Sequence, residues 1–343
     1  MPDRPPIRWG ILGTGNIARK FAKALNESPS ARLVAVGSRS GPPARGFADD
    51  FGAEHAHGSY EELLRDADVD AVYISLPNHL HAEWTARTAS AGKHILCEKP
   101  FTVNAAEARA TMETVREARV FFMEAFMYRC HPQTAKIVEL IVEGVIGEVR
   151  LIQAGFTYNM GLNYDNIRLS LEAAGGGIMD VGCYPVSICR LIAGAARRNP
   201  FQNPLEVRGV AHIGEVSHVD QQAAAVLKFP GGLVASVTAA TQVASDNILR
   251  IFGSEGNLVV PSPWFPAPEK AVIHLRRNGE EPRDIEVSAP GSLYTHEINL
   301  LADCVRRHDR EAPSPAMTWA DTIGNMEVLD AWRKDVGLVF KGD

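Results

Sequence analysis

A glycine-rich turn near the start of the chain has the residue types and spacing of a phosphate-binding loop. Gly13, Gly15 and Ala18 fit the pattern G-x-G-x-x-G/A, between an apolar run and a helical pattern. The first glycine allows a tight turn, the second lets the backbone approach a pyrophosphate, and a small third residue lets helix and strand pack closely. N–H groups at a helix start also attract phosphate. The turn, with Asn16 and Ile17 inside it, therefore predicts a dinucleotide site.

The end of the next apolar run predicts which dinucleotide is bound. Arg32–Val36 has the pattern of a strand, and Gly37, Ser38 and Arg39 follow it without a carboxylate. Proteins that prefer NAD usually carry an Asp or Glu there, which binds the ribose 2′-hydroxyl. A hydroxyl followed by a guanidinium instead suits a 2′-phosphate, which Arg binds bidentately. We therefore expect a preference for NADP(H).

A lysine follows another short apolar run. His94–Cys97 predicts a strand, and Glu98, Lys99 and Pro100 come directly after it. The carboxyl ends of parallel strands face the ligand crevice of an open α/β sheet. We therefore expect Lys99 to reach both cofactor and substrate.

A glycine-rich block in the middle of the chain carries a carboxylate and a phenol. Gly175–Gly177 precede Asp180 and Tyr184, which as residues i and i+4 of a helix would share a face and address one polyol. A phenol with a pKa of about 10 is a poor base at neutral pH. A neighbouring ammonium group lowers that pKa toward the working range. Tyr184 with Lys99 therefore suits removal of a hydroxyl proton during alcohol oxidation, or its donation in reverse.

Short apolar runs and helical patterns alternate over the first third of the chain. This alternation predicts parallel β-α-β units with helices on both faces, that is, a doubly wound Rossmann sheet. Besides the strands named above, the expected elements are strands at Ile7–Leu12, Ala71–Leu76 and Val120–Ala125, and helices over Ile17–Leu25, Pro42–Phe51, Tyr60–Leu64 (with Ser59 as N-cap), Leu80–Ala91 and Asn104–Ala118.

The pattern changes near residue 128, where we place a domain boundary. Beyond it, closely spaced β-type runs predict antiparallel neighbours in a larger sheet, with Pro230-Gly231-Gly232 as a hairpin turn. The expected strands are Glu148–Tyr158, Glu206–His212, Ala223–Phe229, Leu233–Ala239 and Ile248–Phe252, and the expected helices are Pro132–Glu143, one with Ile298, Leu301 and Val305 on one face, and one near Ile323–Trp332.

Composition bounds the class of protein. The 343 residues suggest two domains, at about 150 residues each. The net charge of −6 argues against nucleic-acid binding. No apolar run approaches the ~18 residues of a membrane span, and the N-terminus lacks a secretory pattern. The five cysteines form no C-x-x-C pair, so neither a disulfide framework nor a zinc knuckle is expected. We therefore expect a soluble, cytoplasmic protein.

Taken together, these motifs resemble the glucose–fructose oxidoreductase/inositol dehydrogenase (Gfo/Idh/MocA) family over nearly the whole chain. The resemblance rests on the glycine turn, the segment Leu76–His81, Glu98-Lys99-Pro100 and the block from Gly175 to Tyr184. Met123–Phe126, Arg129 and a tyrosine at 184 are similar to the dihydrodiol dehydrogenase and NADP-dependent xylose dehydrogenase branch.

The resemblance implies a fold and roles for single residues. It implies a Rossmann domain, residues 1–128, and an α/β domain, residues 129–343, whose large open, mainly antiparallel sheet binds substrate and mediates homodimers or homotetramers. Lys99 would be catalytic or positioning, Tyr184 the general acid/base, and Asp180 a ligand of a substrate hydroxyl. The cofactor-binding residues would include Leu76, Pro77, Asn78, His81 and Glu98.

Three further features give weaker signals. Arg129 and Arg168 are either substrate contacts or ordinary ion-paired arginines. His55 with His57, and His79 with His81, lack a carboxylate or thiolate at a familiar zinc spacing, so no metal is expected. The proline-rich loop that contains Trp264 and Phe265, residues 261–268, is interpreted as a surface loop.

The leading hypothesis is an NADP-dependent oxidoreductase of a sugar or cyclic polyol, with the nicotinamide and the substrate meeting between the two domains. Oxidation of an aldose or ring hydroxyl is the leading direction. One alternative keeps NADP tightly bound and exchanges hydrogen between two sugars. Another is a non-catalytic dinucleotide-sensing protein, but Lys99 and Tyr184, whose loss would mark such a protein, are both present.

Overall fold

The computed structural model describes residues 5–343 and divides them into two compact units. The first unit contains the described residues up to Thr102, Ala106–Met127 and Gly291–Trp319, and the second contains Val103–Ala105, Tyr128–Pro290 and Ala320–Asp343. The boundary predicted near residue 128 coincides with one unit boundary, but the chain returns to the first unit after residue 290.

The contacts of helix α8, Leu293–Arg306, explain this return. α8 packs against α1, Asn16–Glu27, and Ser28 Oγ donates a 2.8 Å hydrogen bond to Asn299 Oδ1. Ile298 and Leu301 are fully buried, as their predicted position on an apolar face requires. A division at residue 128 alone is therefore too simple.

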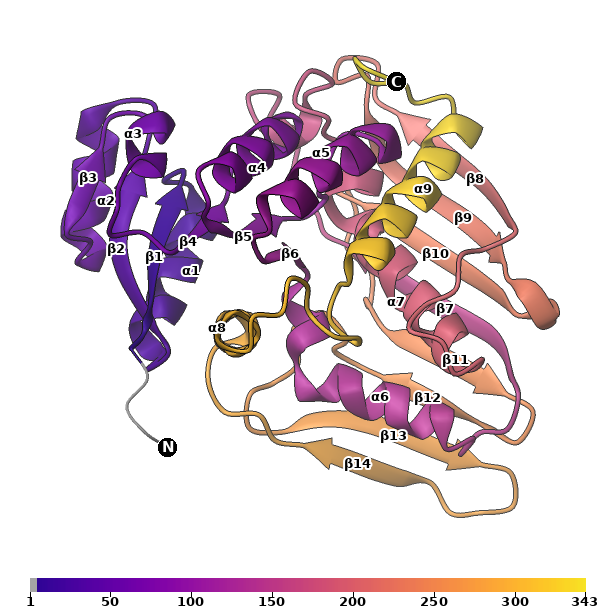
Figure 1. Cartoon of the computed structure of the whole chain (residues 1–343). Coiled ribbons are helices and arrows are strands. Elements are labelled where there is room, and N and C mark those ends of the chain that lie inside the picture. Colours follow the sequence, from indigo (N-terminus) through magenta and orange to yellow (C-terminus); the bar gives the residue numbers. More distant parts are fainter. Residues whose placement is uncertain (1–4) are drawn as a thin grey trace. The chain divides into compact units, whose positions relative to one another are not determined.

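The first unit is built on a parallel sheet of six strands in the order β3-β2-β1-β4-β5-β6 (Figure 1). The order reverses direction between β1 and β4, which places a ligand crevice at the carboxyl ends of the strands. This confirms the predicted doubly wound sheet. The strands are β1 Ile7–Leu12, β2 Ala31–Gly37, β3 His55–His57, β4 Ala71–Ile74, β5 His94–Glu98 and β6 Phe122–Ala125, and the further helices are α2 Gly41–Phe51, α3 Tyr60–Leu64, α4 His81–Ser90 and α5 Ala105–Ala118.

Local chemistry accounts for the ends of these elements. Ser59 Oγ accepts the Glu62 N–H at 3.2 Å, as predicted for the N-cap of α3. Gly52 ends α2 at φ 75°, a left-handed conformation that suits glycine. Strand β3 is not predicted by the sequence, because three residues are too few to display a period.

The second unit contains a sheet of eight strands in the order β14-β13-β12-β11-β7-β10-β9-β8. All neighbours are antiparallel except β7 and β10, which run parallel. Gly231 and Gly232, at φ 80° and 85°, form the predicted turn between β9 and β10. The strands are β7 Val149–Thr157, β8 Glu206–Ile213, β9 Asp220–Lys228, β10 Val234–Ala240, β11 Leu249–Gly253, β12 Gly256–Val260, β13 Ala271–Arg277 and β14 Arg283–Val287.

Strands β12, β13 and β14 extend the sheet beyond the sequence prediction. In β13, Ile273 and Leu275 are buried, whereas His274 between them is half-exposed. β14 is an edge strand with no fully buried residue. β12 and β14 have only five residues each, and in β14 Glu286 separates Ile285 from Val287, so neither strand shows a clear period in the sequence.

Helices cover one face of this sheet and leave the other open (Figure 1). The covering helices include α6, Pro132–Val142, and α7, Cys183–Ala195, which pack together and against the sheet. Exposure alternates along β8, and Val210 and Val226 on β8 and β9 are 74% and 48% exposed. An antiparallel sheet commonly alternates in this way when one face is solvated.

The apolar helix α7 corrects the expectation that no apolar run approaches the length of a membrane span. With the turn that precedes it, the segment Ile178–Ala195 has 18 residues and a mean hydropathy of 1.3, sufficient by length and composition to cross a membrane. However, 94% of this segment is buried inside the structure. Its hydropathy is accounted for by packing against β7, β10 and α6.

A buried cluster of charges joins three helical segments of the second unit. Asp321, on α9 (Trp319–Asp335), accepts from Arg129 Nη2 at 2.6 Å and from Arg190 Nη1 at 2.5 Å. The side chains of both arginines are fully buried. Arg129 also donates to Ser187 Oγ at 2.6 Å, and Arg190 to Asn203 Oδ1 at 2.9 Å. One carboxylate thus holds two guanidinium groups that have left water.

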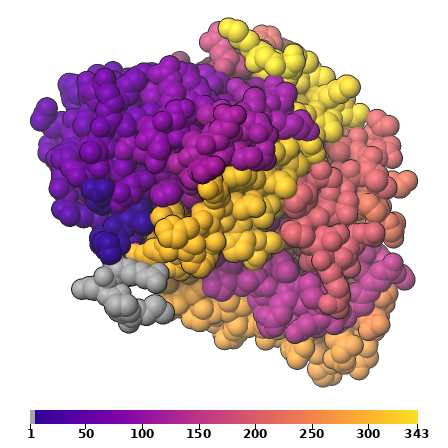
Figure 2. Space-filling model, viewed as in Figure 1, coloured from indigo at the N-terminus to yellow at the C-terminus, as the bar shows by residue number. Residues whose placement is uncertain are grey.

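The C-terminal segment lies at the surface of the second unit and is coloured yellow in Figure 2. Asp343 accepts from Arg333 Nη1 at 2.6 Å and from Asn104 Nδ2 at 3.2 Å. Phe340 packs under the Arg333 guanidinium, 4.6 Å from ring centroid to Cζ. These contacts explain why Val103–Ala105 belongs to the second unit.

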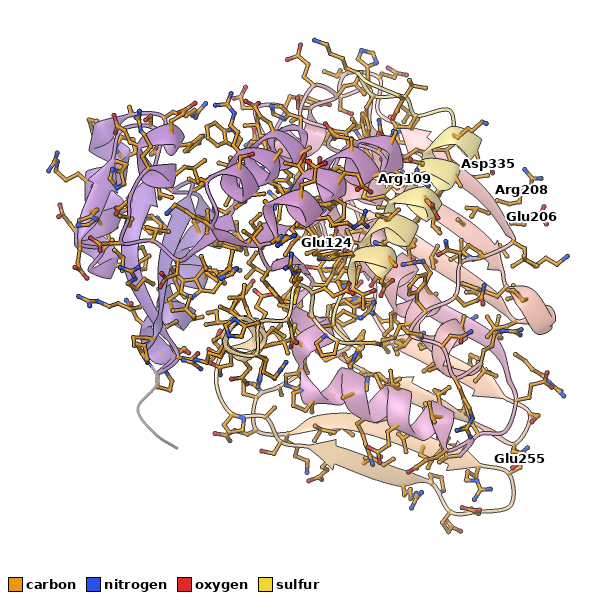
Figure 3. All side chains as sticks on the ribbon, viewed as in Figure 1. Arg109, Glu124, Glu206, Arg208, Glu255 and Asp335 are labelled. Carbon is orange, nitrogen blue, oxygen red and sulfur yellow. The ribbon has the colours of Figure 1, made fainter. Side chains whose placement is uncertain are left out.

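In contrast to the buried cluster around Asp321, the cluster formed by Glu206 and Arg208 on β8 and Asp335 on α9 is exposed (Figure 3). Arg208 donates to Glu206 at 3.0 Å and to Asp335 at 3.3 Å, with 71% of its side chain exposed. Exposed ion pairs contribute little to stability, because water screens them and the long side chains lose entropy.

We expect Asp321→Ala to lower the free energy of unfolding by about 3–5 kcal/mol, since it leaves two buried guanidinium groups without a counter-charge. Urea unfolding followed by circular dichroism measures this change. Glu206→Ala serves as the matched control and should leave the unfolding midpoint near that of the wild type. Equal midpoints for the two variants would contradict a stabilising role for the buried cluster.

Candidate active site

The glycine turn of the first unit has the geometry that a phosphate requires. Gly13 has φ 101°, and a Cβ there would lie 3.0 Å from Ser75 Oγ. At Gly15, the N-cap of α1, a Cβ would meet nothing within 4 Å, so the space beside the backbone is open. Ala18 is fully buried, and no side chain caps the helix. The first N–H groups of α1 at Asn16 and Ile17 are therefore suited to a pyrophosphate.

The tip of β2 lies beside this turn, as the sequence analysis requires. The Gly13 N–H donates to the Gly37 carbonyl at 2.9 Å. Ser38 is buried, whereas Arg39 is exposed and makes no ion pair with any residue that the structure describes. Its guanidinium is thus available to an anion beside the glycine turn.

His81 connects the tips of β4 and β5. Its Nε2 lies 2.7 Å from the Leu76 carbonyl and its Nδ1 lies 2.8 Å from the Pro100 carbonyl. Burial lowers the pKa of His81 to about 4, so the ring is neutral at pH 7 and donates to one of the two carbonyls. Pro77 and Asn78 begin the short helical turn between Leu76 and His81. The structure therefore gives His81 a positioning contact at both strand ends.

Glu98 and Lys99 stand at the end of β5. Tyr73 Oη donates a short hydrogen bond to Glu98 Oε1, and the Lys99 N–H donates to Glu98 Oε2 at 3.3 Å. Burial, together with the Glu98 charge, raises the pKa of Tyr73 well above its usual value, so its hydroxyl remains a donor. Lys99 is half-buried. The residues predicted to bind cofactor thus occupy the carboxyl ends of β1, β2, β4 and β5, along one edge of the sheet.

In the second unit, the glycine block is required by close contacts. A Cβ at Gly175 would lie 2.6 Å from the Arg168 carbonyl oxygen, and one at Gly176 would lie 2.2 Å from Asp220 Oδ1. Gly176 also has φ 101°. Asp220 is fully buried, and its Oδ2 accepts the Ile178 N–H at 2.7 Å. Asp220 therefore holds the start of the turn that carries Asp180.

That turn is not the α-helix that the spacing predicts. Ile178–Gly182 is a π-helical turn, and α7 begins at Cys183. Asp180 lies in the π turn and Tyr184 in the first turn of α7, so one continuous helical segment carries both. Single π turns occur frequently at functional sites, where they re-aim side chains.

Two side chains hold the Asp180 carboxylate. Tyr158 Oη donates to Asp180 Oδ2 at 2.5 Å, and Arg168 Nε donates to the same oxygen at 2.9 Å. Burial and the Asp180 charge raise the pKa of Tyr158, which keeps its hydroxyl protonated. The Asp180 side chain is 12% exposed. Arg168, one of two predicted substrate contacts, is thus an ion-pair partner of Asp180.

The Tyr184 ring lies in a cluster of aromatic side chains. Its centroid is 5.0 Å from that of Phe156, 5.6 Å from that of Tyr128 and 5.7 Å from that of Trp264. The Trp264 indole N–H donates to the Gly155 carbonyl at 2.9 Å. The contacts with Phe156 and Trp264 are edge-to-face and the contact with Tyr128 is tilted, and such aromatic contacts stabilise a ring in one orientation. Tyr184 is therefore held by packing on three sides.

Several of these contacts go beyond the sequence analysis. The interpretation of residues 261–268 as a surface loop is wrong for Trp264, which is 2% exposed, whereas Phe265 is 54% exposed. Tyr158 and Asp220 belong to no motif that the sequence analysis identified, and the predicted strand Ala223–Phe229 begins after Asp220. Arg129, the other predicted substrate contact, is fully engaged in the buried cluster with Asp321.

Comparisons with known proteins identify the family of both units. A model described as "Oxidoreductase family, NAD-binding Rossmann fold" matches residues 7–126. A second, described as "GFO/IDH/MocA C-terminal domain", matches residues 134–259. Together the two matches cover most of both units.

Curated relatives span nearly the whole chain. The trans-1,2-dihydrobenzene-1,2-diol dehydrogenase of Mus musculus is 32% identical, covering 98% of this chain and 99% of that protein. The NADP(+)-dependent D-xylose 1-dehydrogenase 2 of Haloferax volcanii is 34% identical, covering 95% and 96%.

A solved structure with the same fold contains bound cofactor. It is a 3-ketoreductase from Actinomadura kijaniata, in complex with NADP and TDP-benzene, with 31% identity and a TM-score of 0.86 over 97% of this chain and 98% of that chain. Because family models, relatives and structure agree over both units, the chain belongs to the GFO/IDH/MocA family of oxidoreductases.

Proposed function

We propose that the protein is an NADP-dependent oxidoreductase that interconverts a hydroxyl and a carbonyl group on a sugar or cyclic polyol. The observation that carries the proposal is that one chain contains two sets of residues, one suited to the cofactor and one suited to the substrate. One is a phosphate-binding turn beside an arginine without an ion-pair partner among the described residues. The other is a phenol and an anchored carboxylate on one helical segment. The dehydrogenase and ketoreductase relatives support the same reaction class.

The residues of the first unit fit NADP. The α1 N-terminus, with Gly13 and Gly15, would hold the pyrophosphate, and Ser38 and Arg39 the 2′-phosphate. The segments ending β4 and β5, which include Leu76, Pro77, Asn78, His81 and Glu98, would border the nicotinamide end. When bound, NADP supplies the hydride acceptor or donor for the reaction.

The remaining chemistry belongs to the protein's own side chains. Oxidation of an alcohol releases the hydroxyl proton, and Tyr184 Oη would take this proton and return it in the reverse direction. The ammonium group of Lys99 would favour the phenolate form of Tyr184 by charge attraction. The Asp180 carboxylate, held by Tyr158 and Arg168, would accept a hydrogen bond from a substrate hydroxyl.

Two further features support proposals for the compartment and the assembly. All five cysteines are free thiols, four of them buried, which suits a reducing compartment, and we propose a cytoplasmic enzyme. The open face of the eight-stranded sheet carries exposed apolar side chains, among them Val210 and Val226. We propose that a second copy of the chain covers this face, in a homodimer or homotetramer.

We expect Tyr184→Phe to lower kcat by at least about 10²-fold, since general acid–base catalysis contributes this much or more. NADPH binding, followed by fluorescence, should be nearly unchanged, because the substituted hydroxyl belongs to the other unit. The assay follows NADPH absorbance against aldoses, inositols, dihydrodiols and ketosugars. Turnover like that of the wild type would remove Tyr184 from this role.

Two further variants sharpen this test. Tyr128→Phe removes a neighbouring phenol hydroxyl that bonds Ser187 Oγ at 3.1 Å, and it should retain most of the activity.

Lys99→Met tests whether Lys99 and Tyr184 serve one reaction. If they do, the double variant should be no slower than the slower single variant, because groups that act as a unit are not additive. Multiplied losses would separate the two residues.

We expect kcat/KM to be higher with NADP+ than with NAD+, and Arg39→Ala to lower the NADP+ value by about 10–100-fold. This range corresponds to the ~1.5–3 kcal/mol of a hydrogen bond to a charged group. The kcat/KM with NAD+ should change little, because NAD+ lacks the 2′-phosphate. Arg32→Ala, at the opposite end of β2, is the control. A wild type that prefers NAD+ would overturn the assignment.

We expect the wild type to have a mass in solution of two or four times 37.3 kDa, measured by light scattering after gel filtration. Val210→Glu should shift it toward 37.3 kDa, because a charge on a buried apolar interface is costly. Val339→Glu, at a 64% exposed position outside the sheet, should keep the wild-type mass. A monomeric wild type would contradict the proposal.

A further inference from the structure

Three side chains that the proposed reaction does not use meet at the edge of the parallel sheet. His55 and His57 lie on the edge strand β3, and Asp66 follows α3. Residues i and i+2 of a strand point to the same face, so both imidazoles project from one side of β3. The sequence analysis expects no metal here because no carboxylate or thiolate stands at a familiar zinc spacing from the histidines, but the fold brings Asp66 to them.

Both imidazoles are directed at a single carboxylate oxygen. His55 Nδ1 lies 2.6 Å and His57 Nε2 lies 2.9 Å from Asp66 Oδ2. The possible ligand atoms of the three residues all lie within 4.8 Å of one another. The side chains of His55, His57 and Asp66 are 38%, 23% and 7% exposed, so an ion from solvent has access to the rings while the carboxylate is sheltered.

The carboxylate is fixed before any ligand arrives. Asp66 Oδ1 accepts the Asp68 N–H at 2.9 Å, and the Asp66 carbonyl accepts from Lys93 Nζ at 2.6 Å. Burial opposes ionisation of Asp66, but the hydrogen bonds from His57 and His55 outweigh it and lower its pKa to about 2. Such outer contacts orient a ligand and increase metal affinity.

We propose that His55, His57 and Asp66 form a binding site for a divalent transition metal of the zinc class. Two imidazole nitrogens and one carboxylate oxygen suit Zn²⁺ or a similar ion, whereas Mg²⁺ and Ca²⁺ prefer oxygen ligands alone. Solvent would complete the coordination. The site lies wholly within the first unit and is independent of the proposed catalytic residues.

A small movement converts the hydrogen-bonded cluster into a coordination site. Tetrahedral ligands at metal distances of about 2.0–2.2 Å stand about 3.3–3.6 Å apart. The two nitrogen–oxygen contacts of 2.6 and 2.9 Å must therefore lengthen slightly. The half-exposed rings can supply this change by rotation of their side chains, while the buried Asp66 stays in place.

Metal binding would join β3 to the segment after α3. β3 pairs only with β2 in its sheet, and the His57 carbonyl accepts the Ser38 N–H at 3.2 Å. The ion would therefore stabilise the short edge strand that borders the β2 tip. A ligand that binds only the folded state raises thermal stability according to its concentration and affinity.

The test is titration of the full chain, without a histidine tag and freed of metal by chelation, with ZnCl₂. Calorimetry should find one equivalent bound, and saturating Zn²⁺ should raise the melting temperature. MgCl₂ should produce neither effect. Asp66→Asn and His57→Gln should each raise the Kd for Zn²⁺ by at least about 100-fold, the upper range for loss of outer contacts alone.

His79→Gln is the matched control, since His79 is exposed and lies outside the cluster. It should keep the wild-type Kd. Circular dichroism establishes that each variant is folded, and His55→Gln replaces any variant that is not. No binding, or binding that the cluster variants leave unchanged, would overturn the proposal. Neither result would bear on the proposed oxidoreductase, whose activity is measured separately.

Discussion

The position of the catalytic candidates depends on one buried carboxylate. Asp220 accepts the Ile178 N–H, and its other oxygen occupies the place of a side chain at Gly176. The glycines are thus required by contact distance, because β9 and the π-helical turn approach too closely for a Cβ. Asp220 is fully buried, and this burial raises its pKa to about 7. Asp180 and Tyr184 take their places from it.

Each proposed functional group is then held by neighbours that do not react. Tyr158 and Arg168 fix the Asp180 carboxylate, and aromatic rings fix the Tyr184 phenol. In the first unit, the His81 ring contacts carbonyl groups after β4 and after β5, and so it holds these two strand ends together. Rate enhancement depends on groups that are aligned before the reaction, so these supporting contacts matter as much as the reacting atoms.

Two charge clusters, one in each unit, follow the same physical rule. A buried charge is costly unless it is paired, so Arg129 and Arg190 share Asp321, and both imidazoles of β3 face Asp66. Asp321 stands 192 and 131 residues from the two arginines in the sequence, and Asp66 stands 11 and 9 residues from the two histidines. The fold therefore creates charge clusters that residue spacing along the chain does not reveal.

The sequence alone was sufficient for the Rossmann sheet and the glycine turn, because local periodicity and short motifs carry that information. It also yields Lys99, Asp180 and Tyr184 as proposed site residues. It missed β3 and β12 to β14, whose runs are short or interrupted by charges, and it misjudged Trp264 and the extent of the second domain. The π-helical turn, the hold of Tyr158 and Arg168 on Asp180, and the meeting of Asp66 with two histidines were decided by tertiary structure alone. These features depend on which separate segments of the chain come into contact. The residue pattern within a single segment does not contain that information.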